Sequence, residues 1–215
     1  MINNLLIFGD SYSTHKEYIQ EGYAFYYSNE GDGPDTPVKK MLPEETWWKR
    51  LIENTDARLV LNDSWSGSTI GYTGYHGDCS ETSSFICRYK KLEASGFFEK
   101  NNIDTVIVFG GTNDSWCNAP LGEEKFSDWE KRDLYSVLPA VCYFFCELKR
   151  KLPKARIVFI GNCGIKAEIT ECMKNAALRC GGEFIGLDGI DKSSGHPTAL
   201  GMEQIYRQVR EALCH

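Results

Sequence analysis

The sequence lacks a long hydrophobic run and any concentration of basic charge. Its longest apolar stretch, VLPAVCYFFCEL at residues 137–148, has charged neighbours and is much shorter than a membrane span, so we expect a core helix. Lysine and arginine total 24 against 30 aspartates and glutamates, and no Lys/Arg run stands out. Because a nucleic acid or an anionic membrane requires a basic face, the composition favours neither partner.

No C-x-x-C pair occurs among the nine cysteines, which lie at positions 79, 87, 117, 142, 146, 163, 172, 180 and 214. Their odd number and scattered positions are typical of reduced thiols in a reducing compartment. The N-terminus also lacks the basic segment and apolar region of a secretory signal. Together these features favour a cytoplasmic protein, although a leader removed from the natural protein would leave no trace in this sequence.

Short β-rich runs alternate with longer helical patterns along the 215 residues. The runs predict strands over 4–9, 57–63, 104–111, 155–162 and 182–190, and helices over 45–55, 83–101, 130–152, 165–181 and 197–214. Because the predicted strands are almost entirely apolar, we expect a parallel sheet with helices on both faces. The length suits one domain over 1–215, a three-layer α/β/α sandwich with five parallel strands.

Two long segments interrupt this alternation, residues 12–43 and residues 64–82. Both are rich in glycine and tyrosine, and both follow a predicted strand. In parallel α/β sheets, ligands bind beyond the carboxyl ends of the strands. We therefore expect both segments to lie over the same rim of the sheet and to take part in function.

A polar side chain or a glycine turn stands after most of the predicted strands. Ser11 follows the first strand, Gly67 lies in a polar turn after the second, Asn113 follows the third and His196 follows the last. Each of these residues alone is ordinary turn chemistry. Together they supply a hydroxyl nucleophile, an imidazole base and hydrogen-bond donors for an oxyanion, which are the groups that acyl transfer requires.

The same residues carry a resemblance to the GDSL-type, or SGNH, hydrolase family. IFGDSYS resembles the first block of the family, GSTI with ND upstream the second, VFGGTNDSW the third and GHPTALGM the last, in the right order along the chain. The resemblance implies a flavodoxin-like α/β/α fold. It also implies that Ser11 is the nucleophile and His196 the base, with the oxyanion held by the Ser11 N–H, the Gly67 N–H and the Asn113 side chain.

The sequence departs from the family pattern beside the histidine. The family usually has an aspartate three residues before it, where this chain has Ser193. Within DGIDKSSGHP, Asp191 is our first choice for the acid that orients His196, so that the predicted triad is Ser11, His196 and Asp191. Asp188 and a backbone carbonyl remain as alternatives, the latter leaving a Ser-His dyad.

Other polar residues near these blocks have simpler interpretations. We expect Asp10 and Asp114 to have structural roles, with Asp114 bracing the loop beside Asn113. His76 and Asp78 lack a third ligand at a suitable spacing, so no metal site is predicted. Cys117 has no obvious histidine partner and is not expected to be a nucleophile. No cofactor is expected either, because the predicted groups suffice for ester hydrolysis.

The function that we predict from the sequence is hydrolysis of small-acyl esters through an acyl-enzyme on Ser11. The two rim segments carry several tyrosines, which suit a sugar or a small polar ester better than a lipid chain, so acetyl esters of carbohydrates are favoured: Tyr12, Tyr18, Tyr23, Tyr26, Tyr27, Tyr72 and Tyr75. A thioesterase or lysophospholipase of the same family is one alternative. A non-catalytic binding protein on a degenerate hydrolase scaffold is another. The expected partner is a small-molecule ester, and the sequence does not indicate an oligomeric state.

Overall fold

The sheet at the centre of the molecule has five parallel strands in the order β4-β1-β7-β8-β9. We describe it from a computed structural model covering residues 2–31 and 39–214. The strands are β1 (Asn4–Gly9), β4 (Arg58–Ser64), β7 (Thr105–Gly110), β8 (Arg156–Gly161) and β9 (Glu183–Gly186). Counted along the chain their order is 2-1-3-4-5, which is the flavodoxin-like arrangement.

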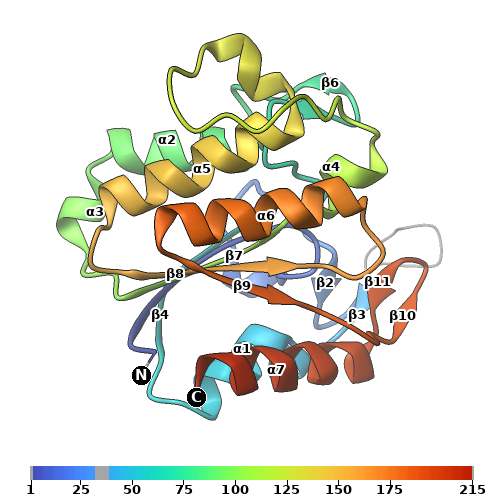
Figure 1. The fold of residues 1–215 in the computed structure, drawn as a ribbon. Coiled ribbons are helices and arrows are strands. Elements are labelled where there is room, and N and C mark those ends of the chain that lie inside the picture. Colours follow the sequence, from blue (N-terminus) through green and yellow to red (C-terminus); the bar gives the residue numbers. More distant parts are fainter. Residues whose placement is uncertain (1, 32–38, 215) are drawn as a thin grey trace.

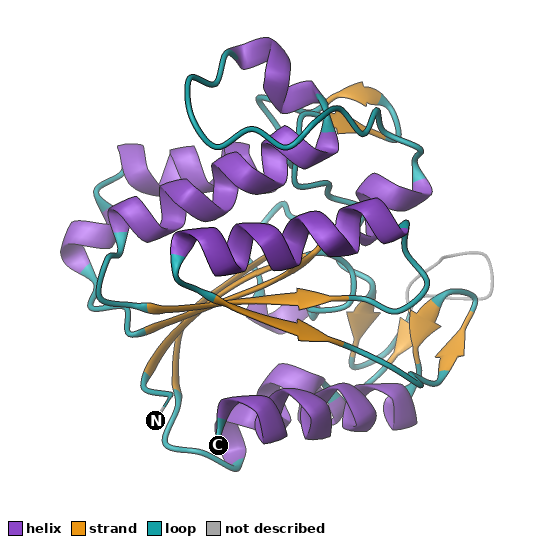
Figure 2. Cartoon of the chain, in the orientation of Figure 1, coloured by secondary structure: helices purple, strands orange, loops and turns teal. Residues whose placement is uncertain are grey.

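Helices cover both faces of this sheet (Figure 1). One face carries α2 (Phe85–Ala94), α3 (Phe97–Lys100), α5 (Val137–Lys151) and α6 (Ala167–Cys180). The opposite face carries α1 (Trp47–Glu53) and α7 (Ala199–Leu213), as Figure 2 shows in the lower layer. The predicted three-layer α/β/α sandwich is thus confirmed.

The alternation of side chains along β1 explains why the sheet needs a helical layer on each face. Leu6 and Phe8 belong to one hydrophobic cluster, whereas Leu5 and Ile7 belong to the other, and all four are fully buried. Successive side chains of a strand point to opposite faces, so an uninterrupted apolar strand must be covered twice. Burying each such side chain contributes about 1.5–3 kcal/mol.

Some element boundaries differ from the sequence expectation. The helix expected over 130–152 is divided into a 3₁₀ helix (Lys131–Tyr135) and α5, and Pro139 lies in the first turn of α5, where its missing N–H costs no helical hydrogen bond. The segment expected as one helix over 83–101 is broken at Gly96, whose φ of 69° is left-handed. Pro197 lies before α7 instead of in its first turn, and Thr198 is the N-cap.

The two interrupting segments hold small structural elements of their own. Residues 12–43 contain a 3₁₀ helix (Lys16–Tyr18), β2 (Tyr27–Ser28) and β3 (Lys39–Lys40), while residues 32–38 of this expected loop lie outside the described residues. Residues 64–82 contain the hairpin of β5 (Thr73–Gly74) and β6 (Gly77–Asp78). Figure 1 shows β2 and β3 beyond the arrowheads of the central strands, next to β10 (Lys192–Ser193) and β11 (His196–Pro197).

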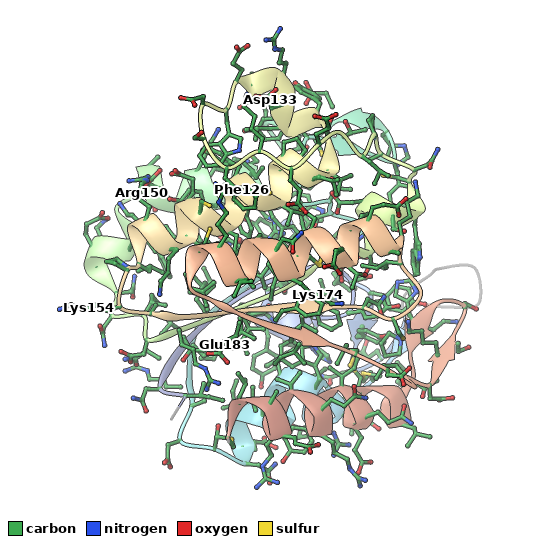
Figure 3. The ribbon with its side chains drawn as sticks, in the orientation of Figure 1. Phe126, Asp133, Arg150, Lys154, Lys174 and Glu183 are labelled. Carbon is green, nitrogen blue, oxygen red and sulfur yellow. The ribbon has the colours of Figure 1, made fainter. Side chains whose placement is uncertain are left out.

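Side chains fill the space between the sheet and its helices, while exposed charges such as Arg150 and Lys154 extend outward (Figure 3). All nine cysteines are free thiols, and the sulfur atoms of Cys142 and Cys172 lie 3.7 Å apart between α5 and α6. Within residues 2–31 and 39–214, no helix has the length and apolar character needed to cross a membrane.

Candidate active site

Ser11 and His196 come from opposite ends of the chain and lie in hydrogen-bond contact. The Ser11 Oγ is 3.0 Å from the His196 Nε2. Ser11 sits in the turn that follows β1, and the Ser13 N–H closes this turn by donating to the Asp10 carbonyl at 3.0 Å. At Gly9, a Cβ atom would lie 2.4 Å from the Ser64 Oγ and 2.5 Å from the Ser13 Cβ, so the turn requires glycine there.

His196 belongs to a tight hairpin that determines what its second ring nitrogen meets. In the β10–β11 ladder, Ser193 pairs with His196, leaving Ser194 and Gly195 as the two-residue turn. Both turn residues have positive φ, 49° and 80°, as the favoured two-residue hairpin turn requires. The turn brings the Ser194 carbonyl oxygen to 3.2 Å from the His196 Nδ1.

The same hairpin directs Asp191 away from the imidazole. Asp191 lies opposite Thr198, whose N–H donates to the Asp191 carbonyl at 3.2 Å and whose hydroxyl donates to the Asp191 carboxylate. Asp188 is exposed and exchanges backbone hydrogen bonds with the Gln208 side chain. Neither aspartate meets His196. Of the three sequence alternatives for the group facing Nδ1, the structure places the backbone carbonyl there.

The surroundings of His196 favour the neutral imidazole. Burial lowers the pKa of His196 below its usual value, and the positive charges of Lys192 and Lys39 act in the same direction, whereas the contact with the Ser194 carbonyl raises it. A base must be neutral before it accepts a proton. The lowered pKa thus favours the form of His196 in which a ring nitrogen can accept a proton.

Two backbone N–H groups near Ser11 have no acceptor. Within the described ranges, neither the Ser11 N–H nor the Gly67 N–H donates a hydrogen bond to the protein. Gly67 has a φ of 79°, and a Cβ there would meet nothing within 4 Å. The left-handed backbone at this position favours glycine.

The Asn113 amide is held between two partners. Asn113 lies in α4 (Thr112–Trp116), is 3% exposed, and donates from Nδ2 to the Ser68 carbonyl at 2.9 Å. Its Oδ1 accepts from the Tyr75 hydroxyl at 3.1 Å. Because an amide nitrogen carries two hydrogens, one N–H remains for another acceptor.

Two buried carboxylates brace the turns that carry these groups. Asp114 accepts from the Ile70 N–H at 3.0 Å and the Gly71 N–H at 3.3 Å, which ties α4 to residues 64–82. Burial raises the pKa of Asp114 to about 6. Asp10 accepts from the Tyr12 N–H at 3.0 Å, and burial raises its pKa to about 7.

Sequence reasoning missed Arg88, which is fully buried on α2. Its Nη2 donates to the Gly9 carbonyl at 3.1 Å and to the Ser68 Oγ at 3.3 Å, and its Nη1 pairs with the Asp63 carboxylate at 2.9 Å. Its position in FICRYKKLEA, among residues of the apolar face of the helix, was the available signal. The arginine joins the strand end before Ser11 to the turn that contains Gly67.

Most of the rim tyrosines that suggested sugar stacking are buried. Tyr12, Tyr26, Tyr27 and Tyr72 are each less than 8% exposed, so they serve mainly as packing residues, whereas Tyr75 is 48% exposed. Sequence reasoning did not foresee the position of Tyr26, whose ring lies flat on His196 with the centroids 3.6 Å apart. The reason is that a pattern of aromatic residues does not show which ring faces inward.

The other candidates lie apart from the serine and the imidazole. The Cys117 thiol faces the Thr73 and Asp114 carbonyls. Asp78 accepts from the Ser80 N–H and the Tyr135 hydroxyl. No group of three or more metal-binding side chains was found among the residues that the structure describes.

The groups at the carboxyl ends of β1 and β7 flank the point where the strand order reverses, which is where open α/β sheets bind ligands. The sequence model of the GDSL-like lipase/acylhydrolase family matches residues 3–213. The chain belongs to this family. It is therefore an enzyme that hydrolyses ester bonds, and the recognition made from its four sequence blocks is confirmed.

Solved structures place the chain among close relatives of the same family. A Bacteroides ovatus ATCC 8483 protein classed with the GDSL-like lipases is 35% identical, with a TM-score of 0.88 over 100% of this chain and 99% of that one. A Bacteroides uniformis ATCC 8492 protein of the same class is 39% identical, with a TM-score of 0.88 over 99% and 96%. No curated protein is similar enough in sequence to count as a match.

A more distant structure is a family two carbohydrate esterase from Clostridium thermocellum. It is 19% identical to this chain, with a TM-score of 0.66 over 99% of this chain and 63% of that one. At this identity the similarity shows that the two proteins share a fold.

Proposed function

We propose that this hydrolase is a serine esterase in which Ser11 is the nucleophile and His196 the general base. The distance of 3.0 Å between the Ser11 Oγ and the His196 Nε2 carries this proposal. A serine hydroxyl is a weak nucleophile at neutral pH, and a neighbouring base that takes its proton activates it. The unpaired N–H groups of Ser11 and Gly67, on the same rim, support a place for the oxyanion beside this pair.

In the proposed reaction, His196 takes the proton of Ser11 as the Oγ attacks the ester carbonyl. The oxyanion then accepts hydrogen bonds from the Ser11 N–H, the Gly67 N–H and the free amide hydrogen of Asn113. The intermediate collapses as the imidazolium of His196 protonates the leaving alcohol, and the acyl group stays on Ser11. Water repeats the sequence with the same base and releases the acid.

The base acts in this proposal as part of a dyad instead of the triad that we predicted with Asp191. The Nδ1–H of His196 donates to the Ser194 carbonyl, which leaves the lone pair on Nε2, facing Ser11. The carbonyl fixes the tautomer as a carboxylate would. It carries no full negative charge, so it stabilises the imidazolium less than an aspartate does.

A small acyl group on a polar alcohol is the proposed substrate, with acetylated carbohydrates as the favoured class. A hollow of about 240 Å³ adjoins Gly67 and is lined by Trp65, Tyr75 and His76. The ring of Trp116, which is 41% exposed, packs edge-on against His196. Accessible aromatic rings beside a small hollow suit a sugar ring better than a lipid chain. The distant relatives include an acetyl xylan esterase from Butyrivibrio proteoclasticus.

The compartment that we propose is the cytoplasm. The support is the state of the nine cysteines, all of which are free although Cys142 and Cys172 lie within thiol contact. Disulfides persist in oxidising compartments and are rare in reducing ones.

Labelling with a fluorophosphonate tests the nucleophile directly. We expect one adduct, mapped to Ser11 by mass spectrometry, and no adduct and no turnover of p-nitrophenyl acetate with Ser11→Ala. Ser127→Ala is the control because Ser127 is exposed, lies outside both rim segments, and donates its hydroxyl only to the neighbouring Asp128 carboxylate. An adduct on another serine, or full activity of Ser11→Ala, would contradict the assignment.

A second experiment defines the substrate by comparing turnover of acetyl, butyryl and octanoyl esters with turnover of acetylated xylo-oligosaccharides. The non-catalytic alternative predicts no turnover of any of them.

A further inference from the structure

The phenol ring of Tyr26 lies flat against the imidazole of His196. The ring centroids are 3.6 Å apart and the planes differ by 9°. Tyr26 is 7% exposed, so the stacked faces are shielded from water. Tyr12 and Trp116 approach the same imidazole at centroid distances of 5.6 and 5.9 Å, with planes tilted by 52° and 76°. Of these three rings, only Tyr26 presents its face to the imidazole.

Backbone hydrogen bonds fix the position of Tyr26 relative to the nucleophile turn. The Tyr26 N–H donates to the Thr14 Oγ1 at 2.9 Å, and the Thr14 hydroxyl donates to the Ser11 carbonyl at 3.0 Å. On the other side, the Lys39 N–H donates to the Tyr26 carbonyl at 2.8 Å. Tyr26 is therefore connected to the residue that carries the nucleophile by two successive hydrogen bonds.

The neighbouring Tyr27 connects the same segment to the base. Its hydroxyl donates to the Pro197 carbonyl at 2.8 Å, next to His196, and its ring packs edge-on against Tyr26 at 4.9 Å. Movement of the Tyr26 ring away from the imidazole would break both its stack on His196 and its edge contact with Tyr27. The packing of this segment therefore holds the stack in place.

The charges around His196 do not favour its protonated form. Lys192 on β10 and Lys39 on β3 are the charged side chains that act on it, and both are positive. Asp10, in the nucleophile turn, directs its carboxylate to the Tyr12 N–H, and Tyr12 itself donates its hydroxyl to the Gly195 carbonyl. Among the described residues, no carboxylate contacts the imidazole, so the imidazolium needs stabilisation from another source.

We propose that Tyr26 is a positioning residue that fixes the ring plane of His196 and stabilises its imidazolium through the negative face of the phenol ring. The proposal rests on the proposed function only in giving His196 the role of base. The face of an aromatic ring attracts a cation within about 6 Å of its centroid, and the attraction strengthens when water is excluded. The stack would then supply part of the stabilisation that an aspartate gives in a triad.

The test measures the pKa of His196 directly, by NMR titration of its imidazole C–H signals. The signal is assigned by its absence in His196→Gln, since the chain has four histidines. We expect Tyr26→Leu, which keeps apolar bulk but has no ring face, to lower the pKa of His196 by about 0.5 to 1. Tyr26→Phe, which keeps the ring, should leave the pKa within about 0.2 of the wild-type value.

Activity provides a second readout that a purely structural role would not change in this way. With p-nitrophenyl acetate, we expect Tyr26→Leu to lower kcat by about 5- to 30-fold and to move the acidic limb of the kcat profile to lower pH. Tyr26→Phe should restore both. Tyr206→Leu is the control for loss of a tyrosine, because Tyr206 lies on α7 outside both rim segments, and it should change neither.

A shape-preserving variant covers the case in which Tyr26→Leu fails to fold. Pentafluorophenylalanine at position 26 keeps the ring but reverses its charge distribution, so it should lower the pKa of His196 at least as much as leucine does. An unchanged His196 pKa in the folded leucine or pentafluoro variant overturns the inference. A wild-type protein that turns over no ester while its His196 pKa follows the ring at position 26 overturns the proposed function and leaves the stack intact.

Discussion

Arg88 donates from its guanidinium to the backbone carbonyl of Gly9, at the end of the strand that precedes Ser11. The same guanidinium contacts the Ser68 hydroxyl and the Asp63 carboxylate, and all of these groups are buried. A side chain of α2 therefore helps to hold the Ser11 turn beside the turn that carries Gly67.

We expect Arg88→Met to destabilise the protein by about 3–5 kcal/mol, because the Asp63 carboxylate is left buried without its partner. Urea denaturation measures the change in the free energy of unfolding. The double variant Arg88→Met/Asp63→Leu should recover part of the loss, since it removes the unpaired charge. A cost below about 1 kcal/mol for the single variant would show that the ion pair is not needed for stability.

Asp191→Asn should leave kcat within about threefold of the wild-type value, because the Asp191 carboxylate contacts Thr198 and not His196. Loss of a true triad aspartate lowers turnover by about 10⁴-fold. The measurement is kcat with p-nitrophenyl acetate on protein whose circular dichroism is unchanged, with Asp188→Asn as the control. If kcat fell by several orders of magnitude in the Asp191 variant alone, Asp191 would be the third member of a catalytic triad after all.

Asn113→Ala should lower kcat by about 10²–10³-fold with little change in KM, because its amide hydrogen is proposed to bind the oxyanion and not the ground-state ester. Tyr75→Phe serves as the partial variant. It removes only the hydroxyl that orients the Asn113 Oδ1, and a loss of about 2- to 10-fold is expected. A rise in KM with kcat intact would assign Asn113 to substrate binding instead.

Asp10 gives a dependence of stability on pH. Its folded pKa of about 7 is raised above the value of 3.8 for an exposed aspartate, so its contribution is fully present below pH 3.8 and is lost as the pH rises through 7. Asp10→Asn removes this dependence and keeps an oxygen for the Tyr12 N–H. At pH 8 relative to pH 4, the variant should gain about 4 kcal/mol over the wild type, measured by urea denaturation. Parallel stability curves for the two proteins across this range would contradict the raised pKa.

Local sequence patterns were enough to predict the central sheet and to single out Ser11 as a candidate site residue. The run LLIF predicts β1 because four successive buried residues fit a strand covered on both faces, and the polar residues that end it mark the rim. The family resemblance then rests on short blocks that each follow a strand. Such signals depend only on neighbouring residues in the sequence, so they can be recognised without knowing how the chain packs.

The group that faces Nδ1 of His196 depended on hairpin geometry instead. The spacing in DGIDKSSGHP brings Asp191 near the histidine only if the segment loops widely, whereas the positive φ angles of Ser194 and Gly195 produce a two-residue turn. The pair Ser194-Gly195, which lies between two short extended segments, is typical of a hairpin turn, and the sequence prediction did not use it. The stack of Tyr26 on His196 had no such signal, because the two residues lie 170 positions apart in the sequence.

The separation of Ser11 and His196 by 185 positions has a consequence for the order of events during folding. Bringing two positions so far apart together has a loop-closure cost, and the pair can form only when the β10–β11 hairpin lies beside the turn that follows β1. A chain still emerging from the ribosome therefore holds Ser11 without His196. On the proposed function, we expect a chain to gain hydrolytic activity only after both segments have been made and have packed together.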